Sequence, residues 1–331
     1  MSQLRRQFDY KWVIIAACFT MVLVTLGFCS SSSGLYTAAI ADAFGMPRSV
    51  ASIIKSFRYI ATTIINLYFG FLLKRFGIRK LIAFGFLSLV ASCAAFAYGT
   101  TLPIFYLGGF LVGVGLAFTS TTIASFIVRR WCTTNVGKYT GIVLASNGIG
   151  GAIASQITIP ILQGSKFGYQ QAYKLIIIIL VVTAVVCISL LREKTKGKEV
   201  IAEIPKKKNR GAFWTGIEYS TVKKRYYFYL IAVCVFLTGL LLQGISDVKS
   251  VHMQDVQVPN DFIVNLASIS SLVLTFSKVI VGFVYDRYGL RPIVLICHGM
   301  TVLSFVLMCF ITPTTFGLVC ASVAAITLRA L

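Results

Sequence analysis

The chain has 331 residues, of which 57% are hydrophobic and only 12% are charged, and its mean hydropathy is +0.84. This composition excludes a water-soluble globular protein, in which about a quarter of the residues are charged. The net charge of +21 does not indicate a nucleic-acid-binding domain, because the basic residues lie between long apolar runs.

Ten segments are long and apolar enough to cross about 30 Å of hydrocarbon as helices. The sequence therefore predicts an all-α polytopic membrane protein. The first segment follows a short basic stretch and is too long for a signal-peptide core, so we interpret it as a retained span. The predicted spans are 12–34, 49–73, 79–99, 103–128, 138–163, 171–191, 226–246, 261–284, 292–312 and 314–331.

The distribution of Lys and Arg predicts the orientation of these spans. With the N-terminus in the cytoplasm, 23 of the 31 basic residues fall on the cytoplasmic side and 4 fall on the outer side. Cytoplasmic loops are enriched in basic residues, so we predict a cytoplasmic N-terminus.

The stretch 192–225 is the long hydrophilic segment of the sequence, and it contains 11 basic residues. It predicts a division into a six-span bundle at 1–191, a basic cytoplasmic linker at 192–225 and a C-terminal bundle of spans 7–10 at 226–331. The linker is either simply solvated or also binds anionic lipid headgroups, and the two interpretations are compatible. Each basic residue near an anionic leaflet contributes about 1 kcal/mol to such binding.

An internal repeat is the most specific signal in the sequence. Residues 70–80 read GFLLKRFGIRK, and residues 282–291 read GFVYDRYGLR at an offset of 212. Both copies lie in predicted cytoplasmic loops, after spans 2 and 8. Two halves that repeat a six-span unit in the same sense are typical of transporters.

The repeat resembles the G-x-x-x-D-R-x-G-R-R loop of the major facilitator superfamily, and the resemblance extends over all 331 residues. Finer features are similar to the branch of oxalate/formate antiporters and monocarboxylate transporters: Gly113–Phe118, Arg129–Trp131, and the basic Lys278 four residues before Gly282. The resemblance implies two six-span halves in a plasma membrane. Since members usually have twelve spans, the second half is expected to be incomplete, with a truncation at the C-terminus.

The resemblance also implies a conformational latch on the cytoplasmic side. In the family, the loop Asp pairs with Arg and faces the N-terminus of a helix in the other half. Asp286 is therefore expected to meet the start of span 5, whereas Lys74 stands where the first copy should have its Asp. The expected latch residues are Gly70, Arg75, Gly77, Arg79, Gly282, Asp286, Arg287, Gly289 and Arg291.

Four basic residues remain inside the predicted spans: Lys55, Arg58, Lys278 and Arg329. A basic residue at the membrane centre costs about 2.5–3.5 kcal/mol on insertion scales. Arg58 lies near the middle of span 2 and predicts an anion site or gating pair, with a structural hydrogen bond to carbonyls as the alternative. Lys55 and Lys278 lie close enough to a span end to snorkel, and Arg329 is left without an assigned role.

Spans 2 and 8 each have a continuous polar face, which is predicted to line a water-filled path because it cannot face lipid. The resemblance adds that an Arg at the position of Lys278 binds the substrate carboxylate, and Asn66 is the counterpart of Lys278 in the repeat. Ser30–Ser33 and Tyr36 either line the cavity or mediate helix packing. The predicted substrate-binding residues are Arg58, Lys278, Asn66, Thr275, Asn147 and Gln243.

No Asp or Glu lies deep in a predicted span, so the cavity favours an anionic substrate that itself neutralises the cations. We predict a secondary transporter of small organic anions, mono- or dicarboxylates, that works by alternating access through exchange or proton coupling. The alternatives are a carrier of another small solute with structural cations, and a truncated membrane protein that does not transport.

The sequence predicts no enzyme chemistry. His252 and His298 have no ligand or nucleophile partners in the sequence, and no phosphate-binding loop is present. We expect no cofactor, no metal, no nucleic acid and no obligate protein partner.

Overall fold

The computed structural model describes residues 2–31, 33–132, 136–164, 167–191, 225–258, 260–312 and 315–329. Within these ranges the regular structure is helical and no strand occurs. Most of the predicted linker 192–225 lies outside the described residues.

The helices follow one another with short connections. The first part of the protein has α1 (Ser2–Leu26), the π-helical turn η1 (Gly27–Ser31), α2 (Ser33–Phe44), α3 (Arg48–Phe76), α4 (Ile78–Tyr98), α5 (Leu102–Thr119), α6 (Thr121–Trp131), α7 (Val136–Gly164) and α8 (Gly168–Leu190). The second part has α10 (Tyr226–Asp255), α11 (Asn260–Tyr288), α12 (Leu290–Met308) and α13 (Thr315–Arg329).

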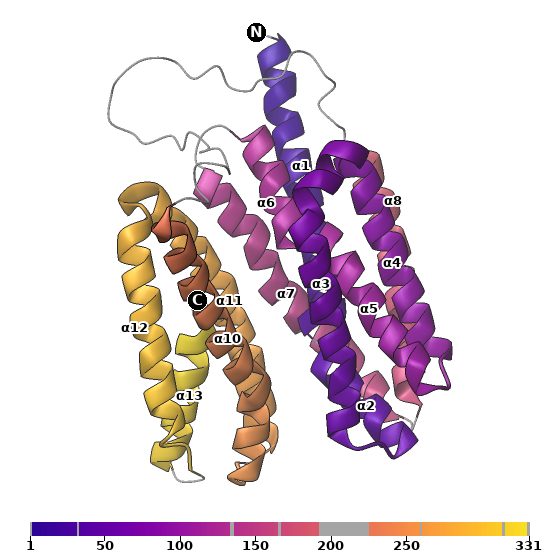
Figure 1. The fold of residues 1–331 in the computed structure, drawn as a ribbon, viewed down its shortest axis with the longest axis vertical. Coiled ribbons are helices and arrows are strands. Elements are labelled where there is room, and N and C mark those ends of the chain that lie inside the picture. The colour runs from indigo at the N-terminus through magenta and orange to yellow at the C-terminus, as the bar shows by residue number, and fades with distance from the viewer. Residues whose placement is uncertain are drawn as a thin grey trace.

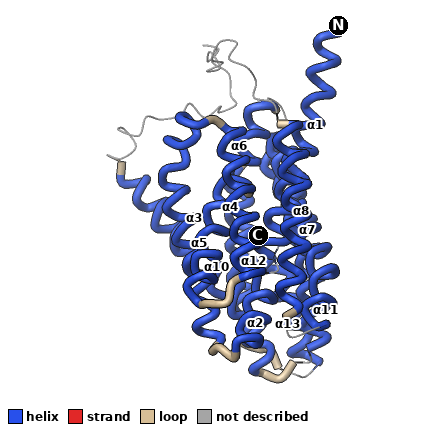
Figure 2. Tube along the Cα trace, turned by 90° about the vertical axis from the view of Figure 1, so that its right-hand side faces the viewer, coloured by secondary structure: helices blue, strands red, loops and turns tan. Residues whose placement is uncertain are grey.

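Two bundles lie side by side in Figure 1, one built from α1–α8 and the other from α10–α13, and Figure 2 shows their described elements as helices joined by loops. The first bundle encloses a large apolar core with fully buried side chains such as Phe86, Phe118 and Ile123. The second has a smaller core of its own around Met253, Leu266 and other apolar residues. Each bundle therefore buries its own apolar stripe, and α7 and α11 pack together where the bundles meet.

Each predicted span coincides with helical structure, but two spans are interrupted. Span 1 is divided among α1, η1 and α2, and span 4 is divided into α5 and α6 at Ser120. The π-helical turn begins at Gly27, which lies directly against the backbone of Gly150 in α7; a Cβ at Gly27 would lie 2.7 Å from the Gly150 Cα atom. Close backbone packing thus accompanies the irregular turn.

Seven of the described helices are long and apolar enough to cross a membrane by length and composition, and they correspond to predicted spans 1–6 and 9. The other three predicted spans correspond to α10, α11 and α13. The helix α10 has 30 residues, and its described apolar run is Tyr226–Leu240; the described part of α13 has 15 residues. The protein is an all-α, multi-pass membrane protein.

The two copies of the repeat have the same backbone structure. Gly77 joins α3 to α4 with φ +77°, and Gly289 joins α11 to α12 with φ +79°. Their N–H groups donate to the carbonyls of Leu73 and Tyr285, which are also equivalent in the repeat. Only glycine adopts this backbone region without strain, so the motif ends one helix and begins the next within a single residue.

Candidate functional site

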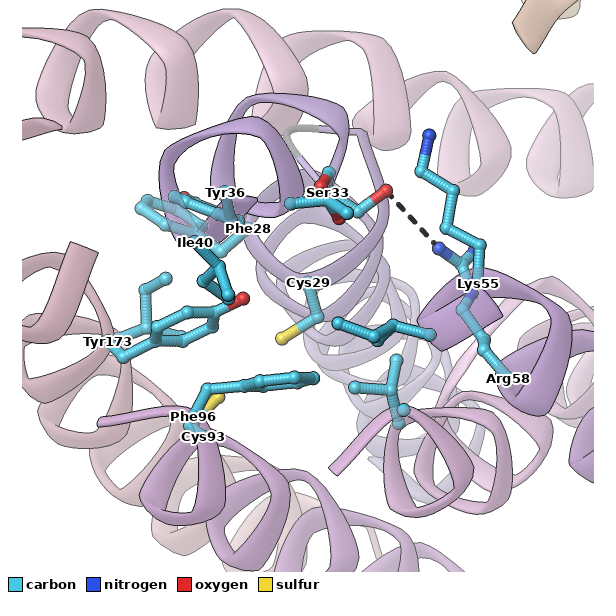
Figure 3. Close-up of a pocket in the computed structure, with 15 residues that line it drawn as sticks. Phe28, Cys29, Ser33, Tyr36, Ile40, Lys55, Arg58, Cys93, Phe96 and Tyr173 are labelled. Atoms are coloured by element: carbon cyan, nitrogen blue, oxygen red, sulfur yellow. Dashed lines mark hydrogen bonds between the residues drawn. The ribbon is translucent and has the colours of Figure 1, made fainter. Parts of the chain in front are cut away.

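A pocket lies inside the first bundle, among η1, α2, α3, α4, α5 and α8 (Figure 3). Its empty volume is about 520 Å³, including the part that is open to solvent. Among the described residues, its lining includes two cationic side chains, those of Lys55 and Arg58, and no carboxylate. The described residues of the lining are Phe28, Cys29, Ser33, Tyr36, Thr37, Ile40, Ile54, Lys55, Arg58, Cys93, Phe96, Gly109, Val112, Tyr173 and Ile176.

Arg58 is held at one side of this pocket by two serine hydroxyls. Its Nη2 donates to Ser30 Oγ at 2.6 Å, and its Nη1 lies 3.5 Å from Ser33 Oγ. Ser30 belongs to the π-helical turn η1 and Ser33 begins α2, so the irregular end of span 1 brings both hydroxyls to the guanidinium. Because both hydroxyls are neutral, these two contacts orient the guanidinium without adding an opposite charge.

The backbone of α3 is fixed at the same level. Thr62 Oγ1 lies 2.9 Å from the carbonyl oxygen of Arg58 and 3.0 Å from that of Gly113 in α5. A Cβ at Gly113 would lie 2.7 Å from Ala61 Cβ, so the two helices approach closely only because this residue is glycine. The position of Arg58 is therefore set by α3–α5 packing.

Lys55 lies one turn before Arg58 and is half-buried. Figure 3 shows its side chain next to that of Arg58, with the ammonium pointing away from the guanidinium and from the aromatic rings. Among the residues that the structure describes, this ammonium forms no hydrogen bond or ion pair. The two cations therefore stand together at one edge of the pocket.

Aromatic rings form the opposite wall. Tyr36 and Tyr173 have ring centroids 5.1 Å apart, and Phe96 stacks on Tyr173 at 4.9 Å. Their exposed fractions are 1% for Tyr36, 4% for Phe96 and 8% for Tyr173. The pocket thus has one cationic side and one apolar, aromatic side.

A line of contacts leads from this pocket to the second bundle. Ser31, next to Ser30 in η1, donates through its hydroxyl to Asn147 Oδ1 in α7 at 3.1 Å. One turn earlier on α7, the carbonyl oxygen of Leu144 accepts a hydrogen bond from Lys278 Nζ of α11 at 3.3 Å. Arg58, Asn147 and Lys278 are therefore linked through η1 and α7, and Lys278 is not part of the pocket lining.

Glycines bring α7 and α11 into backbone contact around Lys278. A Cβ at Gly141 would lie 2.7 Å from the carbonyl oxygen of Lys278, and one at Gly282 would lie 2.6 Å from the carbonyl oxygen of Gly137. Backbone atoms, unlike the end of a flexible side chain, cannot move aside. The close packing of the two bundles therefore requires glycine at these positions.

Asp286 meets the first turn of α7 at the end of this contact. Its Oδ1 accepts from the N–H of Gly137 at 3.1 Å, and its Oδ2 accepts from the N–H of Lys138 at 2.8 Å. These N–H groups belong to the first turn of α7, which has no intrahelical acceptors for them. A carboxylate there also interacts favourably with the helix dipole. We call this contact the latch, and the end of the molecule where it lies the latch end.

The remaining expected latch residues lie at the same end but make different contacts. Arg75 and Arg287 each place the guanidinium over the neighbouring ring, with Cζ 5.7 Å from the Phe76 centroid and 5.4 Å from that of Tyr288. Arg79 and Arg291 are exposed at the starts of α4 and α12. A Cβ at Gly70, unlike one at Gly282, would meet no described atom within 4 Å.

Two other predicted substrate-binding residues, Asn66 and Thr275, are not among the described residues that line the pocket. Asn66 is exposed on α3, and Thr275 is buried on α11 one turn before Lys278. The side chains of Gln243 and Arg329 lie outside the described residues. Sequence reasoning missed Phe96 and Tyr173, because aromatic residues near the outer ends of spans are common and have no distinguishing local pattern.

The sequence profile of the Major Facilitator Superfamily matches residues 10–330. The protein belongs to the major facilitator superfamily. Membership identifies a membrane transporter rather than an enzyme. The sequence is also 24% identical over 310 residues to the uncharacterized MFS-type transporter YcxA of Bacillus subtilis (strain 168), across 92% of this protein and 72% of that one.

Solved structures of other transporters have the same fold. The proton:xylose symporter XylE bound to 6-bromo-6-deoxy-D-glucose has a TM-score of 0.69 at 14% identity, over 98% of this protein and 80% of XylE. XylE from E. coli in a partially occluded inward open conformation has a TM-score of 0.65 at 15% identity, over 97% of this protein and 84% of XylE. A mutant of the nucleoside transporter NupG has a TM-score of 0.65 at 13% identity, over 97% of this protein and 79% of NupG. At these identities the likeness concerns the fold alone.

Proposed function

We propose that this superfamily member is a secondary transporter of small organic anions, mono- or dicarboxylates. The observation that carries the proposal is the pair of cations, Lys55 and Arg58, at the edge of a pocket whose described lining residues include no carboxylate. A cation within the membrane attracts an anion strongly, because the surroundings screen it poorly. Arg in particular matches the planar fork of a carboxylate.

The proposed cycle is alternating access between the two bundles. Asp286 at the first turn of α7 holds the bundles together at the latch end, and release of this contact would open that end. Lys278 bridges α7 and α11 beside the latch, and we propose that it binds substrate once the bridge to the Leu144 carbonyl opens. An empty cationic site is costly to move across a membrane, which favours exchange or co-transport of a proton on the acid.

We place the latch end in the cytoplasm of a plasma-membrane protein with a cytoplasmic N-terminus. The excess of basic residues in the loops on that side supports this orientation. The basic stretch 192–225 is proposed to contact anionic headgroups on the same side.

Thermal unfolding of the detergent-purified protein tests the proposal. The panel contains oxalate, formate, lactate and pyruvate, with xylose and a nucleoside as neutral solutes. A ligand at 100 times its dissociation constant adds about 2.7 kcal/mol to the free energy of unfolding. We expect one or more acids to raise the midpoint, and Arg58→Gln to abolish the rise while a cooperative transition remains.

Lys174→Gln is the matched control, because Lys174 is exposed on α8 and lies outside the pocket lining. This variant is expected to respond to acids as the parent protein does. Stabilisation by xylose or the nucleoside with none by any acid would refute the anion proposal and indicate a carrier of neutral solutes.

A further inference from the structure

We infer that the pocket binds monocarboxylates with an apolar body, in preference to short dicarboxylates; this inference rests on the proposed function. The sequence predicts mono- or dicarboxylates as substrates. The arrangement of the cationic edge and the aromatic wall of the pocket favours the monocarboxylates among them. The carboxylate occupies the edge formed by Lys55 and Arg58, and the apolar body lies against Phe96, Tyr36 and Tyr173.

The cationic edge accommodates one carboxylate. Lys55 and Arg58 are one turn apart on the same helix, so both charged side chains lie at the same edge of the pocket. Two donors of the guanidinium already point at Ser30 and Ser33, which limits the directions from which an acid can approach it. A single carboxylate between the ammonium and the guanidinium satisfies both cations.

The other described residues of the lining offer no partner for a second carboxylate. Its polar atoms are the hydroxyls of Ser33, Tyr36, Thr37 and Tyr173 and the thiols of two cysteines, and none of them is cationic. Lys278, the next membrane-embedded cation among the described side chains, is bonded to the Leu144 carbonyl and does not line the pocket. A second ionised group among aromatic rings would be desolvated without a counter-ion, which is strongly unfavourable.

The apolar side matches a hydrocarbon or aromatic body. Phe96 and the two tyrosines present rings in contact with one another, and Ile54, Val112 and Ile176 complete the surface with aliphatic groups. Stacked and tilted rings of this kind bind another ring or a branched alkyl group favourably. Hydrophobic transfer predicts that each further buried methylene lowers the dissociation constant about fourfold.

The test is a binding series on the purified 331-residue protein, measured by thermal stabilisation and by equilibrium binding of radiolabelled benzoate. The competing acids are acetate, butyrate, isovalerate and phenylacetate, with oxalate and succinate as diacids and benzyl alcohol as the neutral analogue. We expect the affinity to increase with the size of the apolar group, from acetate to phenylacetate. Both diacids are expected to bind roughly tenfold more weakly than benzoate, or weaker still, because their second carboxylate has no counter-ion. Benzyl alcohol is expected not to compete.

Two matched variants on α4 test the aromatic wall. Phe96→Leu keeps an apolar side chain but removes a ring of the pocket, and we expect it to weaken benzoate binding severalfold more than acetate binding. Phe84→Leu makes the same change at a side chain that is 52% exposed and outside the pocket, and is expected to leave both affinities unchanged. A cooperative melt of each variant shows that it is folded.

The outcomes separate this inference from the proposed function. If oxalate or succinate binds as tightly as benzoate, or affinity is flat across the series, while Arg58→Gln still abolishes binding, the apolar-body inference is wrong and the organic-anion proposal stands. Equal effects of Phe96→Leu and Phe84→Leu on benzoate binding would likewise overturn the inference alone. Binding of benzyl alcohol as tight as that of benzoate, or binding of no acid at all, would overturn both.

Discussion

Replacing Asp286 by Asn tests the latch, because the side chain keeps nearly the same size and shape while its charge is removed. The carboxylate accepts two hydrogen bonds, at 3.1 Å from Gly137 N and 2.8 Å from Lys138 N. The amide of Asn retains one acceptor oxygen but loses the charge, the second acceptor and the favourable interaction with the α7 dipole. A hydrogen bond to a charged group contributes about 1.5–3 kcal/mol. Because Asp286 is exposed, we expect a loss near the lower limit, about 1.5 kcal/mol.

Amide hydrogen exchange measures this loss directly. The N–H groups of Gly137 and Lys138 belong to the first turn of α7 and have Asp286 as acceptor, so their protection depends on the latch. A loss of about 1.5 kcal/mol corresponds to exchange about tenfold faster in the peptide that covers 136–141. Exchange in the middle of α4 is expected to be unchanged.

Asp42→Asn is the matched control, because Asp42 is an exposed aspartate on α2, far along the sequence from both latch helices. It should not alter exchange in 136–141. If Asp286→Asn exchanges in this peptide at the parent rate, the carboxylate does not hold the first turn of α7 and the latch argument fails.

The other predictions concern packing and the interior cations. Gly282→Ala should loosen α7 from α11 and lower the thermal midpoint of the protein, whereas Gly70→Ala, its counterpart in open space, should not; equal midpoints would contradict the packing argument. Ser30→Ala removes a hydrogen bond to a guanidinium and should weaken carboxylate binding to Arg58 in a calorimetric titration; unchanged affinity would show that the hydroxyl does not orient Arg58. Lys278→Met removes the bridge to the Leu144 carbonyl and should speed exchange in 141–147; parent-like exchange would argue against the bridge.

Much of the fold follows from local sequence, because each span is a long apolar run and helix formation in a membrane satisfies its own backbone. Both copies of the repeat were predicted to lie in loops, and Gly77 and Gly289 in these loops have nearly identical φ angles. The same repeat was a poor guide to packing. Gly282 lies against α7, whereas Gly70 meets no described atom within 4 Å. Equivalent positions in a repeat share backbone geometry, but their neighbours depend on tertiary contacts.

The candidate pocket could be predicted only in part. Arg58 stood out because an interior cation is rare. Phe96 and Tyr173 did not, since nothing local reveals that α4 and α8 place their rings on one wall. The acceptor of Lys278 is the backbone carbonyl of Leu144, a group that every residue has and that the residue type cannot indicate. The π-helical turn that presents Ser30 and Ser31 to different helices was likewise not predicted.

The single-residue junctions at Gly77 and Gly289 have a mechanical consequence. Two helices joined by one residue cannot pivot independently, because only one pair of backbone dihedrals separates them and any side chain at φ near +80° would strain the joint. We therefore expect α3–α4 and α11–α12 each to move as a rigid helix pair, so that rotation of one helix also rotates the other. A spectroscopic label on Leu295 of α12, which is 75% exposed, would thus record the movement of α11 without disturbing the helix that contacts α7.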